Sequence, residues 1–177
     1  MRRPFHLLFV VLAACGVAEQ PDWARTVAAY EVPLPTPDDK ARFVDVMSAA
    51  AEKEGLHVDS ATADELRSLS EVSPITFNAA IWRGKNDEEA LVSAMDFRDN
   101  IGRVWVTFSL GQDQALSNRL RDNLVADMKR QWPATASLPI MPNGGIPLVE
   151  DLVRTPDGYR VKTAAAAKYA AGPRDQN

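Results

Sequence analysis

The sequence contains very few of the side chains from which disulfides and metal sites are built: one cysteine and two histidines among 177 residues. A single cysteine excludes an internal disulfide, and so few thiolate and imidazole ligands exclude the usual zinc sites. Acidic residues outnumber basic ones, 24 against 20, and no basic run follows Arg2-Arg3, which argues against a nucleic-acid partner. We therefore expect no metal, no cofactor and no bound nucleic acid.

Motifs of phosphate binding and nucleophilic catalysis are also missing. The sequence has no G-x-x-x-x-G-K-[ST] or G-x-G-x-x-G loop and no G-x-S-x-G nucleophile elbow. His57 precedes Asp59 and Ser60, but such close neighbours along one strand point to different faces, so we expect a structural or surface histidine. Carboxylates such as Glu89 and Asp96 fall near predicted turns, where we expect them to be solvated. These observations predict a protein without enzymatic activity.

The composition is that of an ordinary globular protein, with 46% hydrophobic and 25% charged residues. A chain of this length favours one domain with a proper core.

The strongest local signal lies at the N-terminus. A short basic region, Met1–Phe5, precedes the apolar run Leu7–Ala14, which is the layout of a secretory signal peptide. Even counted to Ala18 the run has 12 residues, short of the roughly 20 that a transmembrane helix needs. The run ends in Leu12-Ala13-Ala14-Cys15, which resembles the lipobox of bacterial lipoproteins. The alternative is an ordinary signal peptide in which the cysteine falls by chance near the cleavage site.

The resemblance implies that residues 1–14 are removed and that Cys15 carries a diacylglyceryl thioether, usually with a further acyl chain such as palmitate on its amine. Lipid on Cys15 would then anchor the exported chain on the periplasmic side of a bacterial membrane. Gly16, in place of an aspartate, favours the outer membrane. The mature chain would have 163 residues, with 18 basic against 24 acidic side chains. Its net charge of −6 favours anchoring by the lipid and not by attraction to anionic head groups.

The mature chain divides into three parts. Residues 15–36 contain several prolines, which suppress helix formation, and are predicted to form a lipidated tether. Residues 37–171 are predicted to form a single α+β domain, and residues 172–177 a flexible tail.

Hydrophobic periodicity predicts the elements of that domain. A helix is expected from Pro37, capped by Thr36, to Gly55, and a second long helix, opened by Asp113 or Ser109, to Trp132. Alternating residues predict strands, and Pro156-Asp157-Gly158 predicts a hairpin turn. The predicted strands are 56–59, 75–82, 90–97, 104–110, 152–155 and 159–163. We expect a small antiparallel sheet with the two main helices on one face, and favour a ferredoxin-like variant.

The candidate binding site is an aromatic face. If the apolar residues of strands 75–82 and 103–110 lie beneath the helices, the opposite face carries Trp82, Arg103 and Trp105 among polar neighbours. Exposed tryptophans in such surroundings are typical of surfaces that bind a sugar, a peptide or a protein. The alternative is that the proline-rich segment 138–148 covers them.

Taken together, the sequence predicts a membrane-anchored lipoprotein of the cell envelope, a non-enzymatic binding or structural module whose partner is an envelope protein or glycan. Two alternatives stay open. One is an inhibitor or immunity-type lipoprotein, and the other is a periplasmic hydrolase without a recognisable motif.

Overall fold

A computed structural model describes residues 21–70, 75–84, 87–97 and 100–170. Within them a six-stranded antiparallel sheet has the order β2-β3-β4-β5-β1-β6, and a separate hairpin pairs β7 with β8. The strands are β1 (Thr26–Pro33), β2 (His57–Ser60), β3 (Asn78–Arg83), β4 (Glu89–Met95), β5 (Arg103–Ser109), β6 (Ala136–Ser137), β7 (Leu152–Thr155) and β8 (Gly158–Val161).

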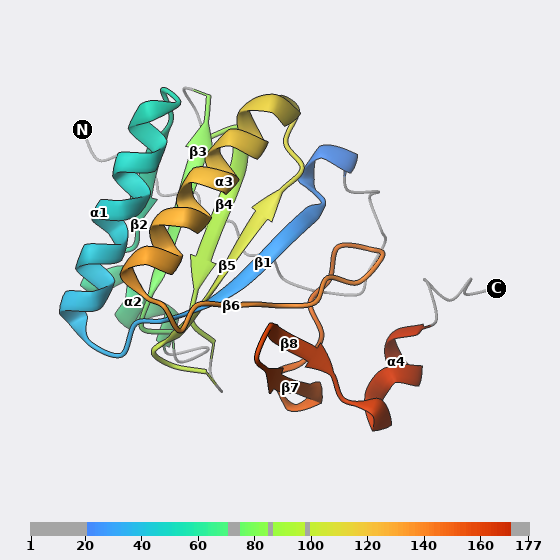
Figure 1. The fold of residues 1–177 in the computed structure, drawn as a ribbon. Helices are drawn as coiled ribbons and strands as arrows, with labels where there is room; N and C mark the ends of the chain where they lie inside the picture. Colours follow the sequence, from blue (N-terminus) through green and yellow to red (C-terminus); the bar gives the residue numbers. More distant parts are fainter. Residues whose placement is uncertain (1–20, 71–74, 85–86, 98–99, 171–177) are drawn as a thin grey trace.

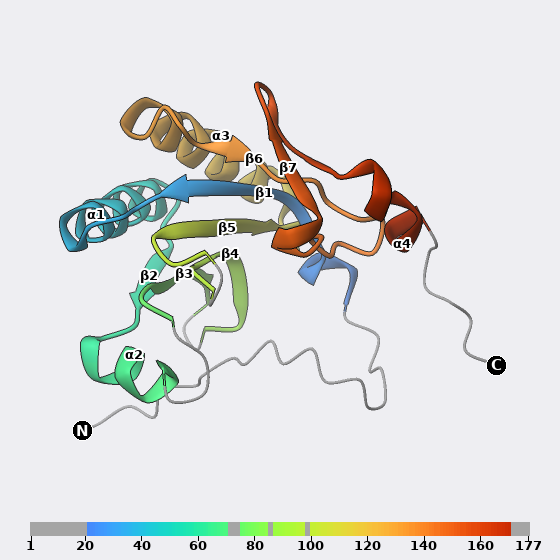
Figure 2. The same cartoon turned by 90° about the horizontal axis from the view of Figure 1, so that it is seen from below.

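Two long helices lie together on one face of the sheet (Figure 1). The helices are α1 (Pro37–Lys53), α2 (Ala63–Ser70), α3 (Gln114–Gln131) and α4 (Ala166–Ala170), with short 3-10 turns η1 (Asp22–Ala24), η2 (Val149–Asp151) and η3 (Thr163–Ala165). Figure 2 shows α1 and α3 on one side of the sheet and α2 on the other, beside β2 and β3. The predicted α+β class, with two main helices on one face, is confirmed.

The two long helices begin at predicted capping residues, and of the two candidates for α3, Asp113 is the cap. The Thr36 hydroxyl accepts a hydrogen bond from the amide of Asp39 at 3.1 Å, and Pro37 occupies the first helical turn. The Asp113 carboxylate caps α3 in the same way, accepting from the amide of Leu116 at 3.0 Å. The core between helices and sheet contains, among others, Phe43, Met47, Ile81, Val106, Phe108, Leu120, Leu124 and Met128.

The connectivity extends a ferredoxin-like pattern. Helix α1 joins β1 to β2, which run in the same direction because three antiparallel strands separate them. Helix α3 joins β5 to β6 in the same way, with β1 between them. The fold therefore keeps two split β-α-β units and adds two strands, β3 and β4, to the middle of the sheet.

The prediction of a tether over residues 15–36 is wrong for its second half. Residues Thr26–Pro33 form β1, an internal strand paired with both β5 and β6. The prolines suggested an extended tether, but an extended chain is also the conformation of a strand, and Pro33 lies at the strand's last position. The folded domain thus begins well before Pro37. The predicted tail, 172–177, lies outside the described residues.

Two carboxylates expected to be solvated are buried. Asp96 is fully buried, and its two oxygens accept hydrogen bonds from the amides of Thr76, Phe77 and Gly102 and from the Thr76 hydroxyl. Glu89 is also buried and accepts from the amide of Gln112 at 2.6 Å. Both carboxylates accept hydrogen bonds from backbone amides, which would otherwise lose their hydrogen bonds to water on folding.

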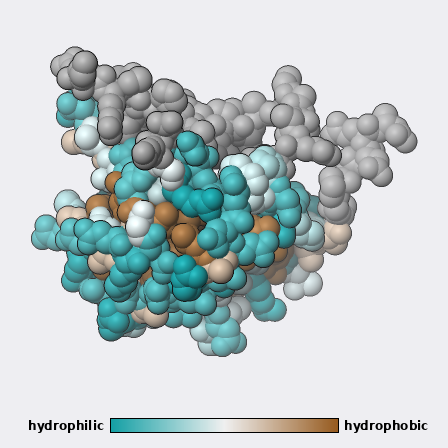
Figure 3. Space-filling view, turned by 90° about the horizontal axis from the view of Figure 1, so that it is seen from above, coloured by the Kyte–Doolittle hydropathy of each residue, from teal (hydrophilic) through white to brown (hydrophobic). Residues whose placement is uncertain are grey.

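Figure 3 looks onto the end of the molecule where α1 ends and α3 begins. Apolar residues gather there in the middle of a hydrophilic rim.

The position of β1 predicts how truncations behave. Removal of residues 1–36 takes away a strand with neighbours on both sides, so we expect the remaining chain not to fold. Removal of residues 1–20 leaves every described element in place and should preserve a cooperative unfolding transition in urea, followed by far-UV circular dichroism. Equal unfolding midpoints for the two truncated chains would contradict a structural role for β1.

Candidate functional site on the rear face of the sheet

We call the side of the sheet opposite α1 and α3 the rear face. Ile81 and Val104 belong to the core beneath the helices, so the alternation of side chains along a strand directs Trp82, Arg103 and Trp105 to the rear face. This agrees with the predicted division of the two strands. The three residues nevertheless differ in exposure and in their partners.

Trp105 is not available to a partner. Only 9% of its surface is exposed, and it belongs to a second apolar cluster between the rear face and the C-terminal segment. Other members of this cluster are Ala29, Leu138 and Leu152, with Ile140, Ile146, Val149, Tyr159 and Val161 packed against them. The prediction of Trp105 as a binding residue is therefore wrong, because a segment distant in sequence folds over it. The covering segment includes part of the proline-rich stretch that the alternative interpretation named.

Arg103 is held by an internal ion pair. Its guanidinium donates to both carboxylate oxygens of Glu31, at 2.8 Å from Nη2 to each, and also to the Tyr159 hydroxyl. Tyr159 donates to Glu31 at 2.7 Å, and the Trp105 indole donates at 3.3 Å. Burial, and then the hydrogen bond to Glu31, raise the pKa of Tyr159 above its ordinary value of 10.0, so the phenol stays a donor. Arg103 thus joins β8 to the sheet, although part of its side chain is exposed.

Trp82 lies on a part of the rear face that is more open. It is half-buried, and Ser93, on the neighbouring strand β4, is exposed. Among the described residues, the second apolar cluster draws its sheet residues from β1 and β5 and contains none from β3 or β4. Of the three predicted binding residues, Trp82 is therefore the one that the C-terminal segment leaves accessible.

His57 is the cross-strand neighbour of Trp82. Its Nε2 lies 2.5 Å from Oδ1 of Asp87, and both side chains are about half exposed, at 48%. Asp87 has a φ of 56°, in the left-handed region, so the turn before β4 holds its carboxylate toward the imidazole in a conformation that few residues adopt. Sequence reasoning did not identify this pair, because residues 57 and 87 meet only through the pairing of β2 with β3.

A second carboxylate on β2 lies in an acidic environment. Burial raises the pKa of Asp59 above 3.8, and the negative charges of Asp87 and Glu65 raise it further. The charged form of Asp59 therefore opposes folding at neutral pH.

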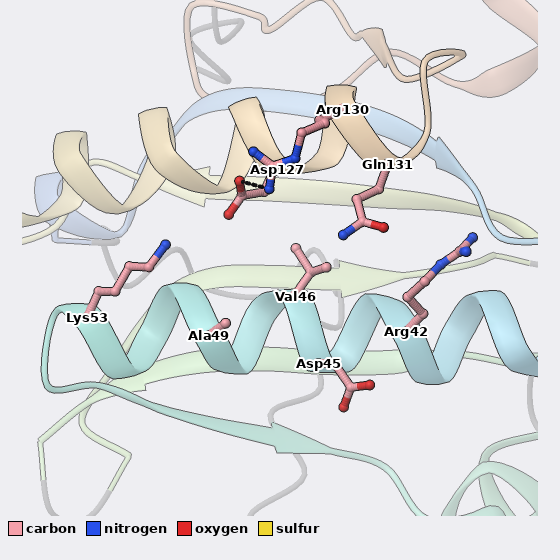
Figure 4. A pocket seen from close by; sticks show the side chains of 8 residues that line it. All are labelled: Arg42, Asp45, Val46, Ala49, Lys53, Asp127, Arg130 and Gln131. Carbon is pink, nitrogen blue, oxygen red and sulfur yellow. Dashed lines mark ion pairs between the residues drawn. The ribbon is translucent and has the colours of Figure 1, made fainter.

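A groove lies between α1 and α3, with a volume of about 310 Å³ (Figure 4). Its charged side chains are mixed in sign and partly paired, since Arg130 contacts Asp127 at 2.7 Å and Arg42 contacts Asp39 at 2.8 Å. In Figure 4 Asp45 points away from α3. The charged groups of the groove do not form a catalytic or ligand-binding arrangement, so we propose no site there. The residues that line it are Arg42, Asp45, Val46, Ala49, Lys53, Asp127, Arg130 and Gln131.

The pKa of Asp59 predicts a pH-dependent effect of Asp59→Asn. Because the folded-state pKa lies above the unfolded value, the native state binds this proton more tightly, and that contribution is lost as the pH rises through the folded-state pKa. The variant should be more stable than the parent at pH 7, by up to about 1 kcal/mol after solvent screening, and no different well below pH 3.8. Urea unfolding at the two pH values measures the difference.

Asp157→Asn is the matched control, since Asp157 is exposed in the β7–β8 turn. It should change stability little at either pH. A loss of stability at pH 7 in Asp59→Asn would show that the carboxylate contributes hydrogen bonds that outweigh its charge.

Among the residues that the structure describes, no three His, Cys, Asp or Glu side chains are grouped so that they could hold a metal ion. In the same part of the chain no helix has both the length and the apolar character to cross a membrane. No protein-family model matches the chain, and no curated protein matches it significantly. The functional interpretation therefore depends on the residues of this chain alone.

Proposed function

We propose that this chain is an exported bacterial lipoprotein, anchored through lipid on Cys15, whose folded domain is a non-enzymatic binding module of the cell envelope. Support for the anchor is that the only cysteine of the sequence stands directly after Leu12-Ala13-Ala14, behind a basic region and an apolar run. Two or three acyl chains, at about 0.8 kcal/mol per buried CH₂, are sufficient to retain a domain of this size at a membrane. The proposed location is the periplasmic side of the membrane, with the outer membrane favoured.

The observation that carries the binding role is the partial exposure of Trp82 on the open part of the rear face. Arg103 and Trp105 serve the internal packing of the C-terminal segment, whereas Trp82 combines a large apolar surface with a polar cross-strand neighbour, His57. An amphipathic aromatic ring in such a setting suits an envelope protein or a glycan.

The hydrolase alternative has one supporting observation, the short contact between His57 and Asp87. A nucleophilic mechanism also needs a hydroxyl or thiol within hydrogen-bond distance of the imidazole. Among the described residues no such group contacts His57, whose hydrogen-bond partner there is Asp87. We therefore favour a binding role for this region. The inhibitor or immunity-type alternative would use the turn between β3 and β4, of which residues 85–86 lie outside the described residues.

The lipid anchor predicts the result of metabolic labelling. Cells that express the full chain and grow with an alkyne analogue of palmitate should yield a labelled protein in the membrane fraction. Cys15→Ser should remove the label, because the thioether forms on sulfur. Absence of label from the parent protein, or label that persists in Cys15→Ser, would refute the anchor.

The binding role predicts the behaviour of Trp82→Ala. After crosslinking in membranes and co-purification have identified a partner, this variant should lose about 2 kcal/mol or more of binding free energy, roughly 30-fold in Kd, as expected for a central aromatic contact. Phe97→Ala is the control, since Phe97 is 44% exposed but follows β4 at the opposite end of the sheet from Trp82. Unchanged affinity of a folded Trp82→Ala protein would exclude this surface.

A further inference from the structure

The folded domain begins close to Cys15, and from this we propose that one end of the sheet faces the lipid bilayer at short range. This end, which we call the proximal end, is formed by η1, residues 110–113 and the residues that flank the β3–β4 turn. The inference rests on the lipid anchor of the proposed function and adds an orientation of the domain on the membrane.

The length of the chain between the lipid and the domain sets how far the domain can lie from the bilayer. Cys15 and Pro21, the first described residue, are separated by six Cα–Cα steps. Whatever path the chain takes, six steps span at most about 22 Å. A tether that extended to Thr36 would have allowed roughly 75 Å, enough for the domain to leave the membrane surface and to turn freely.

The first described element lies at one end of the sheet. The amide of Gly111 donates to the carbonyl of Trp23 at 2.8 Å, and the amide of Leu110 donates to that of Arg25 at 2.8 Å. The same end contains the start of β1 beside the end of β5, since Thr26 pairs with Ser109. Because β1 runs from here to its pairing with Arg103, the opposite, distal end is one strand length away.

That strand length exceeds the reach of the tether. An eight-residue strand is about 26 Å long, and the 17-residue helix α1 beside it has a similar length of about 26 Å. A chain segment of at most about 22 Å cannot run from the proximal end along the domain and still join a lipid beneath the distal end. An upright domain with its distal end on the bilayer would therefore need a longer tether than these six steps.

The composition of the proximal end is compatible with a lipid surface. Figure 3 views this end, and apolar residues are visible at its centre within the hydrophilic rim, although the strongly exposed Phe97 and Ile101 lie at the distal end. Trp23 of η1 is half-buried here, and tryptophan is enriched at the interface between lipid and water. The net charge of −6 gives no attraction to anionic lipid, so the short tether, and not electrostatics, holds this end near the bilayer.

The orientation also places the candidate binding surface. Trp82 and His57 lie where β3 ends and β2 begins, which is the proximal end of the sheet. A partner bound at Trp82 would therefore contact the domain close to the membrane surface. This geometry suits a membrane protein or a membrane-proximal glycan better than a ligand far from the bilayer.

Single-cysteine labelling tests the orientation, because lipidation consumes the only native thiol. The lipidated protein would carry a fluorophore at one introduced thiol and be reconstituted into phosphatidylcholine vesicles that contain a lipid with a spin label on its head group. Four exposed positions represent the proximal end, the distal end, the helical face and the rear face. The variants are Gln112→Cys, Gln131→Cys, Ala49→Cys and Ser93→Cys.

The proposal expects quenching at Gln112→Cys several-fold greater than at Gln131→Cys, with values between these for the two faces. Insertion of a long Gly-Ser linker between Gln20 and Pro21 should remove the difference. Strongest quenching at Ala49→Cys or Ser93→Cys would overturn the proposal in favour of a domain that lies on its side, and equal quenching at all positions in the parent would overturn it in favour of free rotation.

Failure of the anchor gives a different result. A chain that is not lipidated would not sediment with the vesicles and would show a second reactive thiol at Cys15 in every variant. These two readouts separate a wrong orientation from a wrong proposed function.

Discussion

The buried carboxylate of Glu31 is the interaction that holds the C-terminal segment on the sheet. A carboxylate removed from water costs several kcal/mol, which is offset only when its oxygens are fully hydrogen-bonded. Glu31 lies in the internal strand β1 and accepts hydrogen bonds from Arg103 and Trp105 of β5 and from Tyr159 of β8. Because the carboxylate and its donors belong to β1, β5 and β8, three separate parts of the chain, the carboxylate is satisfied only when all three strands have reached their native positions.

This network determines which aromatic residues remain available for recognition. The C-terminal segment needs an apolar surface to pack on, and Trp105 provides it from the centre of the rear face. Arg103 neutralises the charge that lies beside that surface. Trp82 on β3, which three strands separate from β6, lies beyond the cluster, and the C-terminal segment therefore covers one half of the rear face and leaves Trp82 uncovered.

The early start of the domain has consequences for the membrane. An internal strand cannot be released without the loss of pairing on both sides, so the residues of β1 cannot become part of a longer tether. The proposed lipid and the folded body are separated by six steps of the chain, and the anchor therefore constrains orientation as well as location. Trp82, at the proximal end of the rear face, is brought to the membrane by the same constraint.

Sequence by itself determined the features that depend on neighbouring residues. The caps at Thr36 and Asp113 and the hairpin turn at Gly158 need only local backbone geometry, and the predicted elements around them are present. Tertiary structure decided what depends on distant pairing. Membership of β1 in the sheet, burial of Glu89 and Asp96, the cover over Trp105 and the meeting of His57 with Asp87 join residues that are far apart in sequence. Such contacts cannot be predicted from a local segment of sequence, because the free energy that fixes the position of the segment comes from the distant residues on which it packs.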